Sequence, residues 1–164
     1  GCLVGSEMCI RDSDHPGMPK VVVDYAHTPD ALDKVLAALS KQVSKQLICI
    51  VGCGGNRDKG KRPEMARVVA RWADRVWFTS DNPRDEDPDS ILQDMLSGLT
   101  TQQQRSVCVE QNRADAIAQA IQSAGSEDVI LIAGKGHEST QEIAGTKHPF
   151  SDAEVVREVM KENA

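Results

Sequence analysis

The 164-residue sequence contains few aromatic residues: two Trp, one Tyr and two Phe, or 3% of the chain. Any core built from it must therefore be aliphatic. Hydrophobic residues nevertheless make up 40% of the chain and charged residues 27%, which is ordinary for a globular protein. A chain of this length can bury a substantial core within one domain.

The sequence also lacks an excess of basic residues and any long hydrophobic run. Its formal net charge is −6, whereas nucleic-acid-binding proteins normally present a basic face. No apolar stretch approaches the roughly 20 residues that a membrane-spanning helix requires. We therefore expect neither a nucleic-acid partner nor a membrane partner.

Paired cysteines are missing as well. The five cysteines are odd in number and include no Cys-x-x-Cys pair, so reduced thiols in a cytoplasmic protein are the simplest interpretation. His137 and His148 have no metal-ligand spacing with any Cys or carboxylate. We therefore expect no metal site in this chain.

Residues 1–13 show no clear periodicity and do not have the layout of a signal peptide. Their apolar part is short, and no cationic segment precedes it. We interpret residues 1–13 as a leader or scar that is not native, and we exclude them from the fold. The remaining residues, 14–164, are expected to form one domain.

From Lys20 onward, apolar runs typical of buried strands alternate with segments of helical spacing. Strands are expected at residues 21–23, 47–51, 75–79, 107–109 and 128–133. Helices are expected to begin after Thr28, near Pro63 and Pro88, and after Asn112 and Ser151. A hairpin is expected to pair residues 141–143 with 147–150. The alternation predicts an α/β fold with a mostly parallel sheet of about six strands, one antiparallel strand near the C-terminus, and helices on both faces.

The unusual polar and glycine-rich segments follow the expected strands. They are residues 24–27, 52–55, 81–84 and 134–138. In open α/β sheets, ligands bind beyond the carboxyl ends of the strands. The concentration of these segments at one edge favours a binding edge over a set of ordinary surface loops.

The loop after the second expected strand resembles two nucleotide-binding motifs and completes neither. Residues 55–61 match most of a P-loop, but Arg62 occupies the position where Ser or Thr holds Mg²⁺. Gly52 and Gly54 begin a dinucleotide fingerprint, but Arg57 replaces its third glycine. We therefore reject an independent NTPase and a dehydrogenase. Two interpretations stay open, an anion-binding loop at a helix N-terminus and a solvated basic loop; the cations are Arg57, Lys59, Lys61 and Arg62.

The segment Ser80–Pro88 holds four acids, one Arg and two prolines. Because proline restricts the backbone at and before its ring, this loop is expected to be stiff. A rigid loop with an Arg beside an Asp suits a ligand that has both a carboxylate and an ammonium group. A solvated face or a helix cap is the alternative, which we keep for Asp85, Glu86 and Asp87.

Three further residues have a functional and a plain interpretation. Asp24 ends an apolar strand, where a charge needs a partner. Glu138 follows the glycines of residues 134–136, which allow close backbone approach, and could face an ammonium group. His27, taken alone, fits the N-terminal region of a helix without any role.

Four segments in this order resemble the Mur ligase family: residues 24–30, 52–63, 81–84 and 134–138. The resemblance spans about residues 16–160. It implies a C-terminal, Rossmann-like domain that receives the incoming amino acid and closes over ATP. The sequence of residues 81–84, Asp-Asn-Pro-Arg, resembles the form found in members that add meso-diaminopimelate to UDP-N-acetylmuramoyl-L-alanyl-D-glutamate in peptidoglycan synthesis.

The resemblance implies two sets of site residues. The set that binds meso-diaminopimelate is Arg57, Asp81, Asn82, Pro83, Arg84, Gly134 and Glu138. The set that faces the nucleotide is Asp24, Tyr25 and His27. Diaminopimelate carries a carboxylate that lysine lacks, and Arg84 could bind that group bidentately. With lysine bound, a buried Arg would lose its partner, at a cost of about 1–3 kcal/mol.

The resemblance also implies parts that these residues do not supply. They are an N-terminal domain for the UDP-sugar and a central ATPase domain with the P-loop, the Mg²⁺ ligands and a carbamylated lysine. The full enzyme is expected to use ATP and Mg²⁺ to activate a carboxylate that the amine of diaminopimelate then attacks. This chain is expected to orient the amine, to hold no catalytic residue and to be inactive alone.

Two alternatives stay open. One is a stand-alone, non-catalytic module that binds an amino acid or an anion. The other, weaker, is the equivalent domain of a related amide ligase such as a folylpolyglutamate synthetase. The Asp-Asn-Pro-Arg segment at 81–84 and the Gly-Lys-Gly-His-Glu segment at 134–138 argue against the second alternative.

Overall fold

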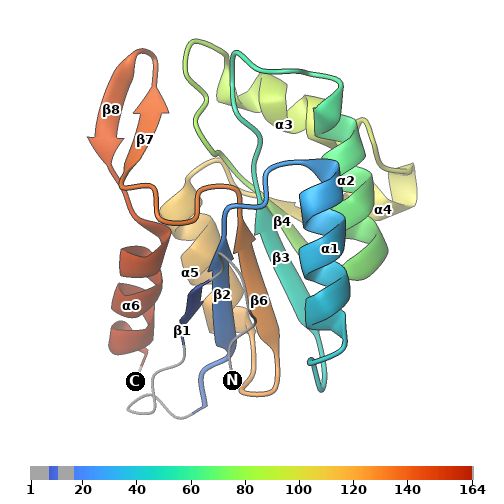
Figure 1. The fold of residues 1–164 in the computed structure, drawn as a ribbon, viewed down its shortest axis with the longest axis vertical. Coiled ribbons are helices and arrows are strands. Elements are labelled where there is room, and N and C mark those ends of the chain that lie inside the picture. Colours follow the sequence, from blue (N-terminus) through green and yellow to red (C-terminus); the bar gives the residue numbers. More distant parts are fainter. Residues whose placement is uncertain (1–7, 11–16, 164) are drawn as a thin grey trace.

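The computed structural model describes residues 8–10 and 17–163. Six strands form one sheet (Figure 1). Their order in space is β1 (Met8–Ile10), β2 (Lys20–Asp24), β6 (Val129–Ala133), β3 (Leu47–Val51), β4 (Arg75–Phe78) and β5 (Val107–Val109). The five strands β2, β6, β3, β4 and β5 run parallel, and β1 pairs antiparallel with β2 at the edge. A separate hairpin pairs β7 (Thr140–Ile143) with β8 (Thr146–Pro149).

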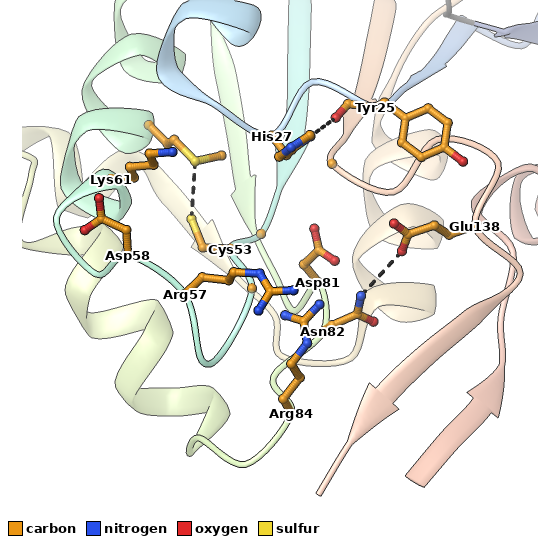
Figure 2. Close-up of a pocket in the computed structure, with 14 residues that line it drawn as sticks. Tyr25, His27, Cys53, Arg57, Asp58, Lys61, Asp81, Asn82, Arg84 and Glu138 are labelled. Carbon is orange, nitrogen blue, oxygen red and sulfur yellow. Dashed lines mark hydrogen bonds between the residues drawn. The ribbon is translucent and has the colours of Figure 1, made fainter. Parts of the chain in front are cut away.

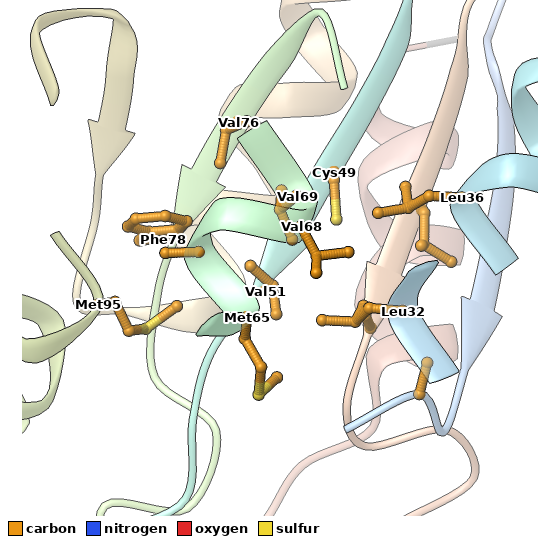
Figure 3. Packing of buried hydrophobic residues seen from close by; sticks show 14 of the residues in the cluster. Leu32, Leu36, Cys49, Val51, Met65, Val68, Val69, Val76, Phe78 and Met95 are labelled. Carbon is orange, nitrogen blue, oxygen red and sulfur yellow. The ribbon is translucent and has the colours of Figure 1, made fainter. Parts of the chain in front are cut away.

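Helices cover both faces of the sheet because successive strand residues point to opposite sides. One face carries α1 (Pro29–Ser40), α2 (Lys61–Trp72) and α3 (Pro88–Leu96), and Figure 3 shows buried side chains of these helices together with those of β3 and β4. The other face carries α5 (Arg113–Ser123) and α6 (Asp152–Glu162). Val22 packs on the first face, whereas Val21 and Val23 pack on the second. Because both faces of these strands are buried, their sequences are continuous runs of apolar residues.

The predicted α/β class with a mostly parallel sheet is confirmed. Strands β3 and β5 have the predicted bounds. The predicted N-caps are also confirmed: the side chains of Thr28, Asn112 and Ser151 accept hydrogen bonds from the first turns of α1, α5 and α6. None of the described helices is long and apolar enough to cross a membrane.

Besides shifts of one residue at several strand ends, four details differ from the predictions. Excluding residues 1–13 from the fold is wrong for Met8–Ile10, which pair with Val21–Val23. The antiparallel pair near the C-terminus, β7 and β8, forms its own sheet, so the antiparallel strand of the main sheet is β1. Helix α2 begins at Lys61 rather than at Pro63. Helix α4 (Thr101–Ser106) was not predicted because it buries no residue.

The parallel strands place their carboxyl ends at one edge of the sheet (Figure 1). Residues 110–112 leave the sheet there after β5, and four longer segments leave it at residues 24–28, 52–60, 79–87 and 134–139. We call residues 52–60 the glycine loop and residues 80–87 the acidic loop. Hairpin β7–β8 lies beside the acidic loop, because Arg84 forms a parallel bridge with Ile143.

Candidate functional site

A pocket of about 510 Å³ opens at this carboxyl edge (Figure 2). All four segments contribute to it, so chain regions far apart in sequence share one cavity. Its lining residues are Tyr25, His27, Gly52, Cys53, Gly54, Arg57, Asp58, Lys61, Met65, Asp81, Asn82, Arg84, Gly134 and Glu138.

Two arginines meet on one side of the pocket. Both side chains lie next to Gly54: a Cβ atom added to Gly54 would be 2.9 Å from Arg84 Nη1 and 3.5 Å from Arg57 Cγ. Arg84 Nη1 donates to the carbonyl oxygen of Gly55 at 2.8 Å, and Arg57 Nη1 donates to that of Asn56 at 3.2 Å. Among the described residues, no carboxylate forms an ion pair with either guanidinium. Two adjacent cations without an anionic partner favour a carboxylate or phosphate ligand.

Another part of the lining carries two carboxylates and an amide in place of arginines. We call these three residues, Asp81, Asn82 and Glu138, the acidic wall. Asp81 is buried, and Asn82 Nδ2 donates to Glu138 Oε1 at 3.4 Å (Figure 2). Burial raises the pKa of Asp81, and the positive charges of Arg113 and Lys135 oppose that rise. Two carboxylates in a partly buried wall favour an ammonium group.

Hairpin β7–β8 holds the acidic loop in position. Arg84 has a positive φ of 54°, which is uncommon for a residue other than glycine. Its backbone N–H donates to the carbonyl oxygen of Glu142 at 3.0 Å, and the N–H of Ala144 donates to the carbonyl oxygen of Arg84 at 2.7 Å. Gln141 Nε2 donates to the carbonyl oxygen of Asp81 at 2.8 Å. These bonds fix the backbone from which the Arg84 side chain projects.

Arg62 and Glu86 join the glycine loop to the acidic loop. Both carboxylate oxygens of Glu86 accept hydrogen bonds of 3.0 Å from Arg62, and Oε1 also accepts one of 2.7 Å from the N–H of Asn56. Arg62 also pairs with Asp94 at 2.9 Å. These contacts lower the pKa of Glu86 to about 2, chiefly through the hydrogen bonds from Arg62.

Two interpretations from the sequence are therefore corrected. Arg62 is 1% exposed and bound to protein carboxylates, so it does not belong to an anion-binding loop. Glu86 is not a solvated acid, because both of its oxygens accept from Arg62. Asp85 is exposed, in line with the solvated-face alternative, and accepts a hydrogen bond from Asn56 Nδ2 at 3.0 Å. Asp87 caps α3, in line with the helix-cap alternative.

Buried charges behind the pocket were missed by sequence reasoning. Arg113 is fully buried and donates through Nε and Nη2 to Asp152 at 2.8 and 2.9 Å. It also donates to the carbonyl oxygens of Ser80 and Ala133, at 3.0 and 3.1 Å, where β4 and β6 reach the pocket. Lys135 is likewise buried, directly behind the acidic wall. No local pattern marks Arg113, because Asp152 lies 39 residues away; Lys135 belongs to the 134–138 segment noted in the sequence, but its partner Asn82 lies 53 residues away.

Most of the residues predicted for the site line this one pocket. The roles assigned to them in the sequence analysis remain predictions. Those that line it are Tyr25, His27, Arg57, Asp81, Asn82, Arg84, Gly134 and Glu138. Pro83 instead lines a second cavity of about 480 Å³. Asp24 is buried below the lining and accepts a hydrogen bond from the N–H of Ala26 at 3.1 Å. His27 Nδ1 donates to the carbonyl oxygen of Tyr25 at 2.7 Å.

Two further kinds of group could bring reactivity to the pocket: the thiol of Cys53 and clusters of metal-ligating side chains among the described residues. Burial raises the pKa of Cys53 to about 12, so its thiol is protonated at neutral pH. No group of three or more His, Cys, Asp or Glu among the described residues could hold a metal ion.

Comparison with known proteins identifies close relatives. Residues 9–136 match the protein family described as "Mur ligase, glutamate ligase domain". The UDP-N-acetylmuramoyl-L-alanyl-D-glutamate--2,6-diaminopimelate ligase of Xylella fastidiosa is 56% identical over 144 residues, which are 88% of this chain and 29% of the relative. The ligase of the same name from Coxiella burnetii is 48% identical over 157 residues, 96% of this chain and 31% of the relative. The chain thus spans less than a third of the length of these curated relatives.

Solved structures give the same relationship. A UDP-N-acetylmuramoyl-L-alanyl-D-glutamate--2,6-diaminopimelate ligase aligns with a TM-score of 0.89 and 43% identity, over 98% of this chain and 32% of that one. A bifunctional folylpolyglutamate synthase/dihydrofolate synthase aligns with a TM-score of 0.57 and 18% identity, over 81% and 29%. The second likeness shows a shared fold alone.

Proposed function

This chain belongs to the Mur ligase family, and from this membership we propose that it is the C-terminal domain of an ATP-dependent ligase. The reaction proposed for the whole enzyme joins meso-diaminopimelate to UDP-N-acetylmuramoyl-L-alanyl-D-glutamate in peptidoglycan synthesis. The proposed partners of this domain are a UDP-sugar domain and a central ATPase domain of the same protein. Its own proposed role is to bind and orient the incoming amino acid.

The observation that carries the proposal is one pocket with two charge patterns. Arg57 and Arg84 meet on one side, and Asp81 and Glu138 lie in the acidic wall. A volume of about 510 Å³ is ordinary for a small-molecule site. Diaminopimelate carries a carboxylate and an amino group at each end, so one end can meet the arginines while an ammonium group meets the wall. Lysine would leave a guanidinium without its anion.

The other predicted residues have proposed supporting roles. Pro83 stiffens the acidic loop, and Gly134, with a positive φ of 114°, carries the backbone past Asp81. Tyr25 and His27 are proposed to face the nucleotide, and Asp24 holds their turn through the N–H of Ala26. The exposed His27 imidazole bonds to the Tyr25 backbone, and the Tyr25 ring lies edge-on to that of His137, 6.0 Å between centroids; such rings fit the base or ribose of a nucleotide.

The chemistry at the acceptor carboxylate is proposed to come from the central domain. When bound there, ATP with Mg²⁺ would supply the phosphoryl group that activates this carboxylate. The residues described here do not form a cluster suited to Mg²⁺, so none is assigned to the metal. This chain holds one amine of diaminopimelate at the reacting carboxyl, and such orientation lowers the entropic cost of the attack.

The test fuses this chain behind the N-terminal and central domains of a diaminopimelate-adding relative. We expect ligase activity with meso-diaminopimelate. Arg84→Ala should raise KM for diaminopimelate about 10- to 100-fold, because a hydrogen bond to a charged group is lost, and should leave KM for ATP within about twofold. The backbone cost at φ 54° is shared by Arg and Ala, so the variant tests the side chain.

Arg67→Ala on the exposed face of α2 is the matched control and should change neither KM. Activity with lysine alone would overturn the substrate assignment. Tight binding of diaminopimelate to the isolated chain in calorimetry, without ATP or partner domains, would instead favour a stand-alone binding module.

A further inference from the structure

Lys135 lies directly behind the acidic wall, and we propose that it is a positioning residue for the ammonium-binding side of the pocket. Its side chain is fully buried and is not part of the pocket lining. Any effect on a ligand must therefore pass through the residues that it contacts. The inference rests on the proposed function, because it assigns Lys135 a part in the binding of diaminopimelate.

The ammonium group of Lys135 contacts every member of the acidic wall. Nζ donates to Asn82 Oδ1 at 2.9 Å and to Glu138 Oε1 at 3.2 Å, and it lies 3.7 Å from Asp81 Oδ1. An ammonium group has three hydrogens to donate and no acceptor. Lys135 thus links the acidic loop, which carries Asp81 and Asn82, to the loop that carries Glu138.

These contacts determine which way the Asn82 side chain points. Its Oδ1 accepts from Lys135 Nζ and from the N–H of Glu142, the latter at 2.9 Å. Because both partners are donors, the amide oxygen must face them, and Nδ2 is left to donate to Glu138 Oε1 at 3.4 Å. Lys135 therefore fixes both the Asn82 amide and the Glu138 carboxylate, which line the pocket.

Lys135 also sets the charge of the wall. When Asp81 and Glu138 are both ionised, they place two negative charges in the wall, and Lys135 contacts both and offsets one; Arg113, which is paired with Asp152, also lowers the pKa of Asp81. The remaining single charge matches one ammonium group. Without Lys135 the pKa of Asp81, already raised by burial, would rise further. The wall would then take up a proton in place of an ammonium ligand.

The experiment uses the fusion ligase and Lys135→Met, which keeps a long side chain and removes the charge. We expect KM for meso-diaminopimelate to rise at least about tenfold, and KM for ATP to stay within about twofold. The acid limb of the pH profile for diaminopimelate should move to higher pH. The charged and titratable groups that face Asp81 are Lys135, Glu138, Arg113, Asp152 and Cys53.

Lys147→Met is the matched control, because Lys147 is exposed on β8. A merely structural role for Lys135 would lower the fraction of folded enzyme and hence the apparent kcat, with KM and the pH profile unchanged. That result would overturn the proposal.

A second variant covers the possibility that Lys135→Met fails to fold. Lys135→Met combined with Glu138→Gln restores the single negative charge of the wall. KM for diaminopimelate is raised in this variant by the loss of Glu138 itself, so the pH profile decides: the acid limb should return to that of the unsubstituted fusion, because Lys135 lowers and Glu138 raises the pKa of Asp81, and a limb that stays shifted would overturn the proposal. If the unsubstituted fusion does not use diaminopimelate at all, the proposed function fails first, and this inference fails with it.

Discussion

At the residue scale, Gly54 and Gly55 are adjacent, but a side chain at each would meet different obstacles. A Cβ on Gly54 would lie 2.9 Å from Arg84 Nη1, the far end of a flexible side chain. A Cβ on Gly55 would run into the carbonyl oxygen of Pro83, which belongs to the backbone of the acidic loop. Only the first obstacle can move without moving the chain.

We therefore expect Gly54→Ala and Gly55→Ala to separate ligand recognition from stability. In the fusion ligase, Gly54→Ala should displace the Arg84 guanidinium and raise KM for diaminopimelate about tenfold, with little change in unfolding free energy. Gly55→Ala should lower the unfolding free energy by about 1–3 kcal/mol, as overpacking does. Urea unfolding and steady-state kinetics measure the two effects. Equal losses of unfolding free energy in both variants would contradict the claim that only Gly55 is constrained by the backbone of the acidic loop.

At the scale of elements, polar contacts join the glycine loop to the acidic loop. Glu86 lies in the acidic loop, Asn56 in the glycine loop and Arg62 in α2, and one carboxylate binds both of the others. The N–H of Gly55 adds a backbone bond of 2.7 Å to the carbonyl oxygen of Asn82. The two arginine-bearing loops therefore form one unit whose integrity depends on the charge of Glu86.

This dependence predicts an acid-sensitive contribution to stability. The pKa of Glu86 is lowered in the folded protein from 4.5 to about 2. A lowered pKa means that the stabilising effect is complete above about pH 4.5 and is lost as the pH falls toward about 2. The difference in unfolding free energy between the unsubstituted chain and Glu86→Gln should be constant near neutral pH and shrink across that window.

Urea unfolding as a function of pH measures this difference. Glu158→Gln, at an exposed position on α6, supplies the baseline for removing a glutamate charge. A difference that persists undiminished at about pH 2 would show that the Glu86 charge does not hold the loops together.

Elements with an apolar pattern were predictable from the sequence, and those without one were not. Strand β3 and helices α1 and α5 bury continuous or periodic apolar residues and carry clear caps. Helix α4 buries no residue, so nothing but its Thr100 capping box marks it. The three residues of β1 acquire a structure through pairing with β2, and a segment that short contains no pattern of its own.

The supporting charges of the site were unpredictable for a different reason. Arg62 finds Glu86 24 residues later, and Arg113 finds Asp152 39 residues later. Lys135 finds Asn82 53 residues away. A charged residue in a sequence is expected at the surface, since only a tertiary partner makes its burial tolerable. The pocket-lining residues were easier to predict, because they follow strands directly.

At the scale of the whole molecule, Arg113 and Asp152 connect the helical layer of α5 and α6 to the edge that carries the pocket. Arg113 is the first residue of α5, and Asp152 is the first residue of α6. The same guanidinium binds the carbonyl oxygens of Ser80 and Ala133, where β4 and β6 lead into the acidic wall. The stability of the domain and the shape of the pocket therefore depend on one buried ion pair.

Asp152→Asn should consequently be among the most damaging single-atom changes in this chain. It preserves the shape of the side chain but leaves the Arg113 charge buried without an ionised partner, which costs about 3–5 kcal/mol of unfolding free energy. Asp115→Asn, at an exposed position in the first turn of α5, is the matched control and should cost much less.

Combining Arg113→Met with Asp152→Leu should cost less unfolding free energy than the sum of the two single changes, because no charge is then left unpaired. Additive losses in urea unfolding would show that the two residues stabilise the domain independently, contrary to the bidentate pairing in the structure.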